Sequence, residues 1–243
     1  MMQKEWFSDW FDSPYYHLLY NNRDQQEAET FMKHLTDYLE ISQDKKVMDL
    51  ACGKGRHAIF LNKLGLDVTG LDLSPQSILF AKQYENSRLH FYEHDMRQIY
   101  AEKEFDIILN LFTSFGYFDT EKENIKAFQS AARSLKKGGK FVLDFFNTNL
   151  IIKHLEKQTT VKRDEILFEI HKKIENNIIL KDISFDVSGK KYHFQERVAA
   201  ISKDSFINYA QLSGLKTKAI LGNYQLADFD EATSPRMIFI FEK

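Results

Sequence analysis

VMDLACGKGRH, residues 47–57, is the stretch of this chain that decides its fold. A short apolar run ends in an acid, two glycines follow, and a helical pattern starts at Arg56. This order predicts a strand, a glycine turn and a helix N-terminus, which together form the framework of a nucleotide-type cofactor site. Glycine suits such a turn because it tolerates positive φ angles and lets a ligand approach the backbone closely.

A second acid, Asp72, ends the apolar run over residues 66–71. An acid at a strand tip, roughly twenty residues after the glycine turn, is placed to accept both hydroxyls of an adenosine ribose. The two features together predict that the chain binds an adenosine-containing small molecule.

The identity of that molecule depends on Asp49. The spacing Gly53-x-Gly55, with Ala58 beyond it, nearly meets the dinucleotide fingerprint, in which a pyrophosphate rests on the helix N-terminus. A carboxylate at Asp49 would repel a pyrophosphate but would attract an ammonium group. S-adenosylmethionine carries such an ammonium group and no phosphate, so the residues favour it, and NAD is the alternative.

Strands and helices alternate along residues 46–147. Apolar runs predict strands at residues 47–50, 66–71, 89–96, 105–112 and 140–145, with two more near 215–222 and 235–242. Capping patterns and helical periodicity predict helices over residues 25–40, from Ser74 to about Tyr84, from Thr120 to near Lys137, and from Lys203. The fold class is therefore α/β: a doubly wound, mostly parallel, seven-stranded Rossmann-like sheet with helices on both faces.

From residue 160 the pattern changes to alternating apolar and polar positions. Three such runs, joined by turns at residues 175–177 and 188–190, predict an antiparallel β insertion after strand five. The chain thus divides into a cofactor-binding core over residues 25–150 and 200–243 and an insertion over residues 160–199.

Residues 1–24 are rich in aromatic side chains, among them Trp6, Trp10, Tyr16 and Tyr20. Their spacing is consistent with an amphipathic helix packed on the core. It is equally consistent with a helical lid that closes over the sulfonium and excludes water. The sequence leaves both interpretations open.

The motifs, taken in order, are D-L-A-C-G-x-G, L-D-L-S, H-D-M and L-K-K-G-G-K-F-V-L-D. This order resembles the class I S-adenosylmethionine-dependent methyltransferases over roughly residues 15–243, and the turn C-G-x-G-R-H resembles their small-molecule branch. The resemblance implies an enzyme that methylates a small molecule at N, O or C. It also implies that the insertion covers the substrate or pairs between subunits, and exposed strand edges favour a homodimer.

The resemblance assigns one group of residues to the methionine half of the cofactor. The glycine turn, at Ala51, Gly53 and Gly55, would pack against the methionine moiety. Asp49 would hold the ammonium directly or through water. A backbone carbonyl at Asn110 or Leu111 would face the same ammonium, and Tyr20 would approach the cofactor from the N-terminal segment.

A second group is assigned to the adenosine half. Asp72 would take the ribose hydroxyls, and Leu73 would flank the adenine. Asp95 and Met96 would hold the edge and the face of the adenine ring.

Methyl transfer from a sulfonium is an in-line displacement, which needs alignment and exclusion of water more than a covalent catalyst. A general base is required only if the nucleophile arrives protonated. The candidates are His57, at the helix N-terminus beside the methyl donor, and Tyr117, after strand four. Each also has a purely structural explanation, since His57 could orient the glycine turn and Tyr117 could pack in the core.

Composition limits the other functions. Thirty-three basic and thirty-five acidic residues give a net charge of −2, and no block of like charge indicates a nucleic-acid arm or a membrane patch. No metal site is expected, because alternation along a strand would put His94 and Asp95 on opposite faces. A single cysteine, the lack of a long apolar segment and the lack of a signal-peptide core favour a cytoplasmic protein.

Three other functions stay open. The chain could bind S-adenosylmethionine without turnover, as a regulatory protein. It could be an NAD-dependent oxidoreductase on a similar sheet, although Asp49 and the run of methyltransferase motifs disfavour this. It could also methylate RNA or protein, against which the balanced charge counts.

Overall fold

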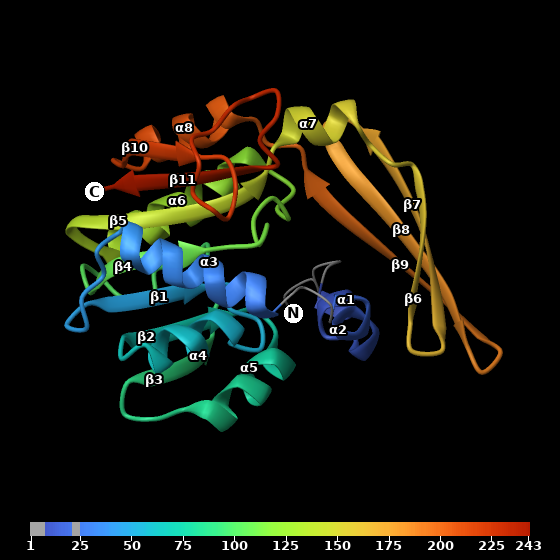
Figure 1. Ribbon diagram of the computed structural model, residues 1–243, viewed down its shortest axis with the longest axis horizontal. Helices are drawn as coiled ribbons and strands as arrows, with labels where there is room; N and C mark the ends of the chain where they lie inside the picture. The colour runs from blue at the N-terminus through green and yellow to red at the C-terminus, as the bar shows by residue number, and fades with distance from the viewer. Residues whose placement is uncertain (1–7, 21–24) are drawn as a thin grey trace.

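The computed structural model describes residues 8–20 and 25–243, which build a central seven-stranded sheet in the order β10-β11-β5-β4-β1-β2-β3 (Figure 1). Its strands are β1 Lys46–Leu50, β2 Asp67–Asp72, β3 Leu89–Glu93, β4 Phe105–Asn110, β5 Leu135–Phe146, β10 Lys216–Leu221 and β11 Arg236–Glu242. Strands β1 to β5 pair in parallel, and β11 runs antiparallel to both β5 and β10. The predicted doubly wound, mostly parallel sheet is confirmed.

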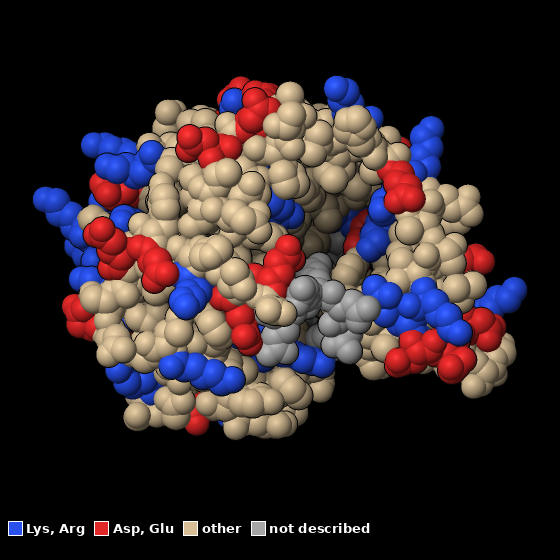
Figure 2. All heavy atoms as spheres, in the orientation of Figure 1, with Lys and Arg blue, Asp and Glu red and all other residues tan. Residues whose placement is uncertain are grey.

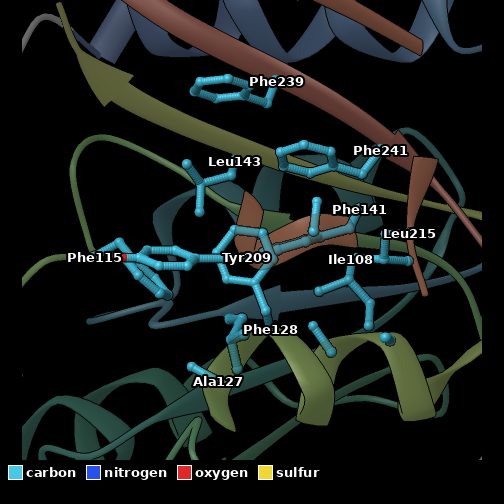
Figure 3. Packing of buried hydrophobic residues seen from close by; sticks show 14 of the residues in the cluster. Ile108, Phe115, Ala127, Phe128, Phe141, Leu143, Tyr209, Leu215, Phe239 and Phe241 are labelled. Atoms are coloured by element: carbon cyan, nitrogen blue, oxygen red, sulfur yellow. The ribbon is translucent and has the colours of Figure 1, made fainter. Parts of the chain in front are cut away.

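Helices cover both faces of this sheet. The first face packs against α3 Gln25–Tyr38, α4 Arg56–Lys63 and α5 Pro75–Ala81, which the short helix η1 Lys82–Tyr84 extends. The second face packs against α6 Glu121–Ser134 and α8 Lys203–Leu212. Figure 3 shows this second layer, in which the Phe128 ring of α6 contacts Tyr209 of α8 and, in the sheet, Phe141 and Phe241.

The chain's capping residues act as the sequence predicts. The Ser74 side chain accepts a hydrogen bond from the Ser77 backbone N–H, with proline at the first position of α5. Thr120 and Glu123 form a reciprocal capping box at the start of α6. These side chains satisfy backbone N–H groups that a helix leaves unpaired at its N-terminus.

The predicted end of α6, near Lys137, is wrong. The helix ends at Ser134 and β5 begins at Leu135, which pairs with Phe105 before the register shifts. The intervening Gly138 has a φ of +76°, and its N–H donates to the Lys243 carbonyl at 2.9 Å. Pairing with the end of the chain therefore draws this segment into the sheet as a bulge.

The insertion is a separate antiparallel sheet in the order β6-β7-β8-β9 (Figure 1). Its strands are β6 Gln158–Arg163, β7 Ile166–Glu175, β8 Ile178–Val187 and β9 Lys190–Ala199, and α7 Thr148–Lys153 precedes them. Both turns fall where they are predicted. Strand β6 is not predicted, because in QTTVKR only Val161 is apolar and an alternating pattern cannot be seen.

Helices α1 Ser8–Phe11 and α2 Pro14–Tyr20 lie between the insertion and the core (Figure 1). Trp10 and Leu19 are buried against Phe168 and Ile183 on one face of the insertion sheet. The rest of the predicted lid, residues 1–7 and 21–24, lies outside the described residues. Aromatic side chains of α1 and α2 thus pack on the insertion.

The surface carries mixed charge. Acidic and basic side chains are interspersed over the face in Figure 2, which is hollowed between the core and the insertion. Within residues 8–20 and 25–243, none of the helices is both long and apolar enough to span a bilayer.

Candidate active site

A cavity lies at the carboxyl ends of the parallel strands, where the chain order reverses between β1 and β4. Such a reversal point is where open α/β sheets bind their ligands. The predicted site residues that line it are Ala51, Gly53, Asp72, Leu73, Asp95, Met96 and Tyr117. Those outside its lining are Tyr20, Asp49, Gly55, His57, Asn110 and Leu111.

The glycine turn presents bare backbone to this cavity. Gly53 has a φ of +55°, and a Cβ added there would meet no atom within 4 Å. A side chain at Gly53 would therefore project into open space at the cavity. Gly55 serves packing instead, because its φ is +81° and an added Cβ would lie 2.7 Å from the Phe91 ring. Between β1 and Gly53, Ala51 also has a positive φ, of 64°.

Asp49 is buried at the end of β1, with 1% of its surface exposed. Burial raises the pKa of its carboxyl to about 7, although a hydrogen bond with the Ala58 backbone lowers it. Its Oδ2 atom has no hydrogen-bond partner among the described residues. A buried carboxylate oxygen without a partner is costly, so this atom is suited to a cationic donor such as an ammonium group.

Asp72 connects three parts of the site. Its Oδ2 accepts a hydrogen bond from the Gly53 N–H at 2.8 Å, and its Oδ1 accepts one from the Ser74 N–H at 2.8 Å. Burial raises the pKa of this carboxyl, and the hydrogen bonds from Ser74 and Gly53 oppose the rise. A carboxylate oxygen can accept more than one hydrogen bond, so each oxygen of Asp72 could also accept one from a ribose hydroxyl.

Asp95 lines the cavity as one side of an ion pair. Arg97 donates to both of its carboxylate oxygens, the shortest contact being 2.7 Å, and also binds Glu123 at 2.7 Å. Burial alone would raise the pKa of Asp95, but the hydrogen bonds and charge of Arg97 lower it below its ordinary value. The acid therefore presents an ionised edge to the cavity.

The basis for excluding a metal at this edge needs correction. Strand β3 ends at Glu93, so strand alternation does not reach His94 and Asp95, and both line the cavity. No cluster of three or more potential metal ligands occurs within the part of the chain that the structure describes.

The segment after β4 forms the opposite wall, over residues 112–118. Upstream of it, the Asn110 amide donates to the Leu50 carbonyl at 2.9 Å, and the Leu111 carbonyl accepts from Ser114 at 2.8 Å. Tyr117 lines the cavity and donates its hydroxyl to the Thr113 carbonyl at 3.0 Å. His57 instead stacks on the Phe112 ring, with centroids 4.8 Å apart.

Helices α1 and α2 complete the cavity with Phe11, Asp12 and Tyr16. The Phe11 ring meets Tyr16 and Tyr117 edge-on, at centroid distances of 5.0 and 5.2 Å. The Asp12 carboxylate accepts a hydrogen bond from the Ser74 hydroxyl. The predicted tyrosine, Tyr20, instead donates to Glu196 of β9 at 2.6 Å.

Sequence analysis misses Asp12 as a site residue. The aromatic character of residues 1–24, which include Phe11, indicates a lid but not which side chains face the cavity, and Glu196 is interpreted as a solvated residue of the insertion. Tyr20 and Glu196 are 176 positions apart, so no local spacing reveals their contact.

The chain is similar to known methyltransferases. A family model described as a methyltransferase domain matches residues 47–139. YqeM of Bacillus subtilis (strain 168), assigned as a methyltransferase, is 31% identical over 166 residues, which cover 65% of this chain and 67% of that protein. The dTDP-3-amino-3,4,6-trideoxy-alpha-D-glucopyranose N,N-dimethyltransferase of Streptomyces venezuelae is 33% identical over 99 residues, or 40% of this chain and 41% of that enzyme.

Solved structures share the fold. A crystal structure of an S-adenosylmethionine-dependent methyltransferase from Clostridium acetobutylicum superposes with a TM-score of 0.79 and 18% identity, covering 96% of this chain and 98% of that one. The chain therefore spans about two thirds of the Bacillus relative, less than half of the Streptomyces enzyme and nearly all of the Clostridium structure.

Proposed function

The chain belongs to the S-adenosylmethionine-dependent methyltransferases, and we propose that it methylates an amine nitrogen of a small molecule. Methyltransferase activity and the cofactor S-adenosylmethionine follow from the family, whereas the small-molecule substrate and its acceptor atom are the proposal. The non-catalytic regulatory protein and the NAD-dependent oxidoreductase are correspondingly disfavoured.

The aromatic wall of the cavity carries this proposal. Phe11, Tyr16 and Tyr117 line the cavity, and the Asp12 carboxylate lies beside them. Aromatic faces and a carboxylate attract cations, and transfer of a methyl group to a neutral amine leaves such a cation, an ammonium group, at this wall. The same wall suits the positive sulfonium.

The names of two relatives point in the same direction. The Streptomyces relative is an N,N-dimethyltransferase of an amino sugar. A glycine/sarcosine N-methyltransferase of Aphanothece halophytica is 31% identical over 137 residues, or 54% of this chain and 49% of that enzyme. Both names specify nitrogen as the acceptor atom.

The proposed roles of the cofactor residues are supported by their surroundings. Asp49, with its unpartnered oxygen, would hold the ammonium of the methionine tail. Bare backbone at Gly53 leaves room for that tail, and Asp72 would accept the ribose hydroxyls. Asp95 and Met96 would flank the adenine.

The remaining residues align the acceptor. When bound, S-adenosylmethionine supplies an electrophilic methyl group. The rings of Phe11, Tyr16 and Tyr117 would exclude water and hold the amine in line with that group. The amine must react with its lone pair free, so its neutral form attacks the methyl group as the bond from that carbon to the sulfur breaks. The methylated ammonium that forms then releases its proton to solvent, so no side chain has to act as general base.

We also propose a cytoplasmic protein and a homodimer. A single cysteine fits a reducing compartment. The edge strands β6 and β9 of the insertion sheet are available for pairing with a second copy. Light scattering after size-exclusion chromatography measures the dimer, and a monomer at all concentrations would contradict it.

The acceptor is tested with matched amines and alcohols. We would incubate the protein and S-adenosylmethionine with glycine, sarcosine, ethanolamine and glucosamine, and with glycolate, ethylene glycol and glucose as hydroxyl counterparts. S-adenosylhomocysteine should form with at least one amine and with none of the counterparts. Turnover with the alcohols would overturn the nitrogen assignment, and tight cofactor binding without turnover would favour the regulatory protein.

A further inference from the structure

Two consecutive residues of the cavity wall have an unusual backbone. Phe112 and Thr113 line the cavity with φ angles of +57° and +63°. L-residues with side chains rarely adopt this left-handed region, and a β-branched residue such as threonine is a genuine outlier there. Such strain persists only where the surrounding structure holds it, and it concentrates at functional sites.

Asp144 of β5 holds both of these residues. It is fully buried, with an exposure of 0%, and its Oδ2 accepts the Phe112 backbone N–H at 2.7 Å. Its backbone carbonyl accepts the Thr113 N–H at 3.1 Å. The backbone N–H groups of Phe112 and Thr113 therefore both donate to Asp144.

Arg236, the first residue of β11, closes the arrangement. Its Nε donates to Asp144 Oδ1 at 2.8 Å, and its Nη2 donates to the Thr113 hydroxyl at 3.0 Å. The planar guanidinium serves the two partners with two nitrogens at a fixed spacing, whereas a lysine has a single nitrogen. Tyr224 adds a hydroxyl donor to Asp144 at 3.3 Å.

The downstream end of the wall is anchored independently. Phe115 is buried in the second core layer, with its ring 5.5 Å from that of Phe128 (Figure 3). The Gly116 carbonyl accepts the Ala199 N–H of β9 at 2.8 Å. Neither contact touches the strained residues. The Tyr117 hydroxyl donates to the Thr113 carbonyl and His57 stacks on the Phe112 ring, but both backbone N–H groups and the Thr113 hydroxyl are held by Asp144 and Arg236.

We propose that the Asp144–Arg236 pair is a positioning device, which keeps Phe112 and Thr113 in the left-handed conformation that shapes the methyl-transfer cavity. A buried ion pair is a poor way to gain stability, because desolvation offsets most of its attraction. The hydrogen bonds of Asp144 and Arg236 instead fix the backbone conformation of Phe112 and Thr113. The inference rests on the cavity being the cofactor site, and it does not depend on the acceptor being an amine.

The test uses the full chain and S-adenosylhomocysteine as probe. Arg236→Lys keeps a positive charge beside Asp144 but loses the simultaneous hydrogen bond to Thr113. We expect the amides of residues 111–118 to exchange hydrogen at least about tenfold faster, and the dissociation constant measured by calorimetry to rise by about tenfold. Arg236→Gln should act in the same direction and more strongly.

Rescue separates positioning from a general structural role. Glycine takes positive φ at no steric cost, so Thr113→Gly should need the arginine less. In the Thr113→Gly background, Arg236→Lys should change the dissociation constant by less than about threefold. The matched control is Asp106→Asn. Like Asp144, Asp106 accepts a backbone N–H, here from Lys46 at 3.0 Å, and binds a basic side chain, that of Lys136, at 2.7 Å. It lies near the start of β4, at the end of the sheet opposite the cavity.

Two results would overturn the proposal. One is unchanged exchange and affinity in folded Arg236→Lys. The other is an equal loss with and without Thr113→Gly, or in Asp106→Asn, which would indicate a loss of overall stability. These measurements use S-adenosylhomocysteine without a methyl acceptor, so they do not depend on whether the acceptor is an amine. The positioning role and the amine assignment can therefore fail independently.

Discussion

The carboxylate of Asp72 accepts the backbone N–H of Gly53 at 2.8 Å, so the acid expected to bind the ribose also braces the glycine turn. Its second oxygen accepts the Ser74 N–H, and the Ser74 hydroxyl donates to Asp12 after α1. This acid thus connects the turn with the start of α5 and, through Ser74, with the residue that follows α1.

Asp72→Ala should weaken binding of S-adenosylmethionine by about 1–3 kcal/mol, because ribose hydroxyls would lose their acceptor. It should also lower the melting temperature, since the N–H groups of Gly53 and Ser74 lose theirs. Calorimetry and thermal unfolding measure the two effects. Asp67→Ala, at the other end of β2, is the control, and equal affinities for both variants would place the ribose elsewhere.

Cofactor affinity should depend on pH through Asp49. Burial raises the pKa of this carboxyl to about 7, whereas an ammonium beside it favours the ionised form. At a pH below this pKa the carboxyl is protonated and must lose its proton when the cofactor binds. The affinity for S-adenosylmethionine should therefore fall by about tenfold for each unit by which the pH is lowered. Calorimetry between about pH 5.5 and 7.5, below the ordinary pKa of an α-amino group, measures it, together with the proton released.

Two controls isolate Asp49. Methylthioadenosine lacks the amino acid tail, so its affinity should not vary with pH, and Asp49→Asn should remove the dependence for S-adenosylmethionine. The stability of the ligand-free protein should change in the opposite sense. Because the folded pKa lies above the unfolded value of 3.8, the contribution is full below that value and is lost as pH rises through about 7. A flat affinity profile for the intact protein would contradict the assignment.

Glu196 should hold the lid helices on the insertion. It accepts hydrogen bonds from Trp10 at 2.6 Å and from Tyr20 at 2.6 Å, and it lies 3.4 Å from the Lys181 ammonium. Glu196→Ala should loosen residues 8–20 by about 1–3 kcal/mol, because these partly buried donors lose their acceptor. Hydrogen exchange of this segment and the dissociation rate of S-adenosylhomocysteine should both increase.

Glu169→Ala is the control for the lid, because Glu169 is exposed on the same insertion sheet and has no role in this network. If the amides of residues 8–20 exchange hydrogen at the same rate in both variants, Glu196 does not hold α1 and α2 on the insertion.

The predictable parts of the molecule are those with a local signal. The run from Val47 to Gly55 predicts β1 and the turn, because burial of a parallel strand and the need for positive φ both constrain consecutive residues. The pair Asp144–Arg236 spans 92 positions and Tyr20–Glu196 spans 176, so each depends on packing that no local pattern encodes. For this reason Tyr20 is predicted beside the cofactor, whereas its hydroxyl binds the insertion.

The two catalytic candidates should respond differently to substitution. Tyr117 lines the cavity, so Tyr117→Ala should lower kcat/KM for the amine acceptor by about tenfold or more through loss of an aromatic wall. Tyr117→Phe keeps the ring and loses only the hydrogen bond to Thr113, so it should have a smaller effect. His57 lies outside the lining, stacked on Phe112, so His57→Gln should leave the pH profile of kcat/KM unchanged. Steady-state kinetics across pH test this: if the fall of kcat/KM toward low pH disappeared in His57→Gln, the histidine would be a general base after all.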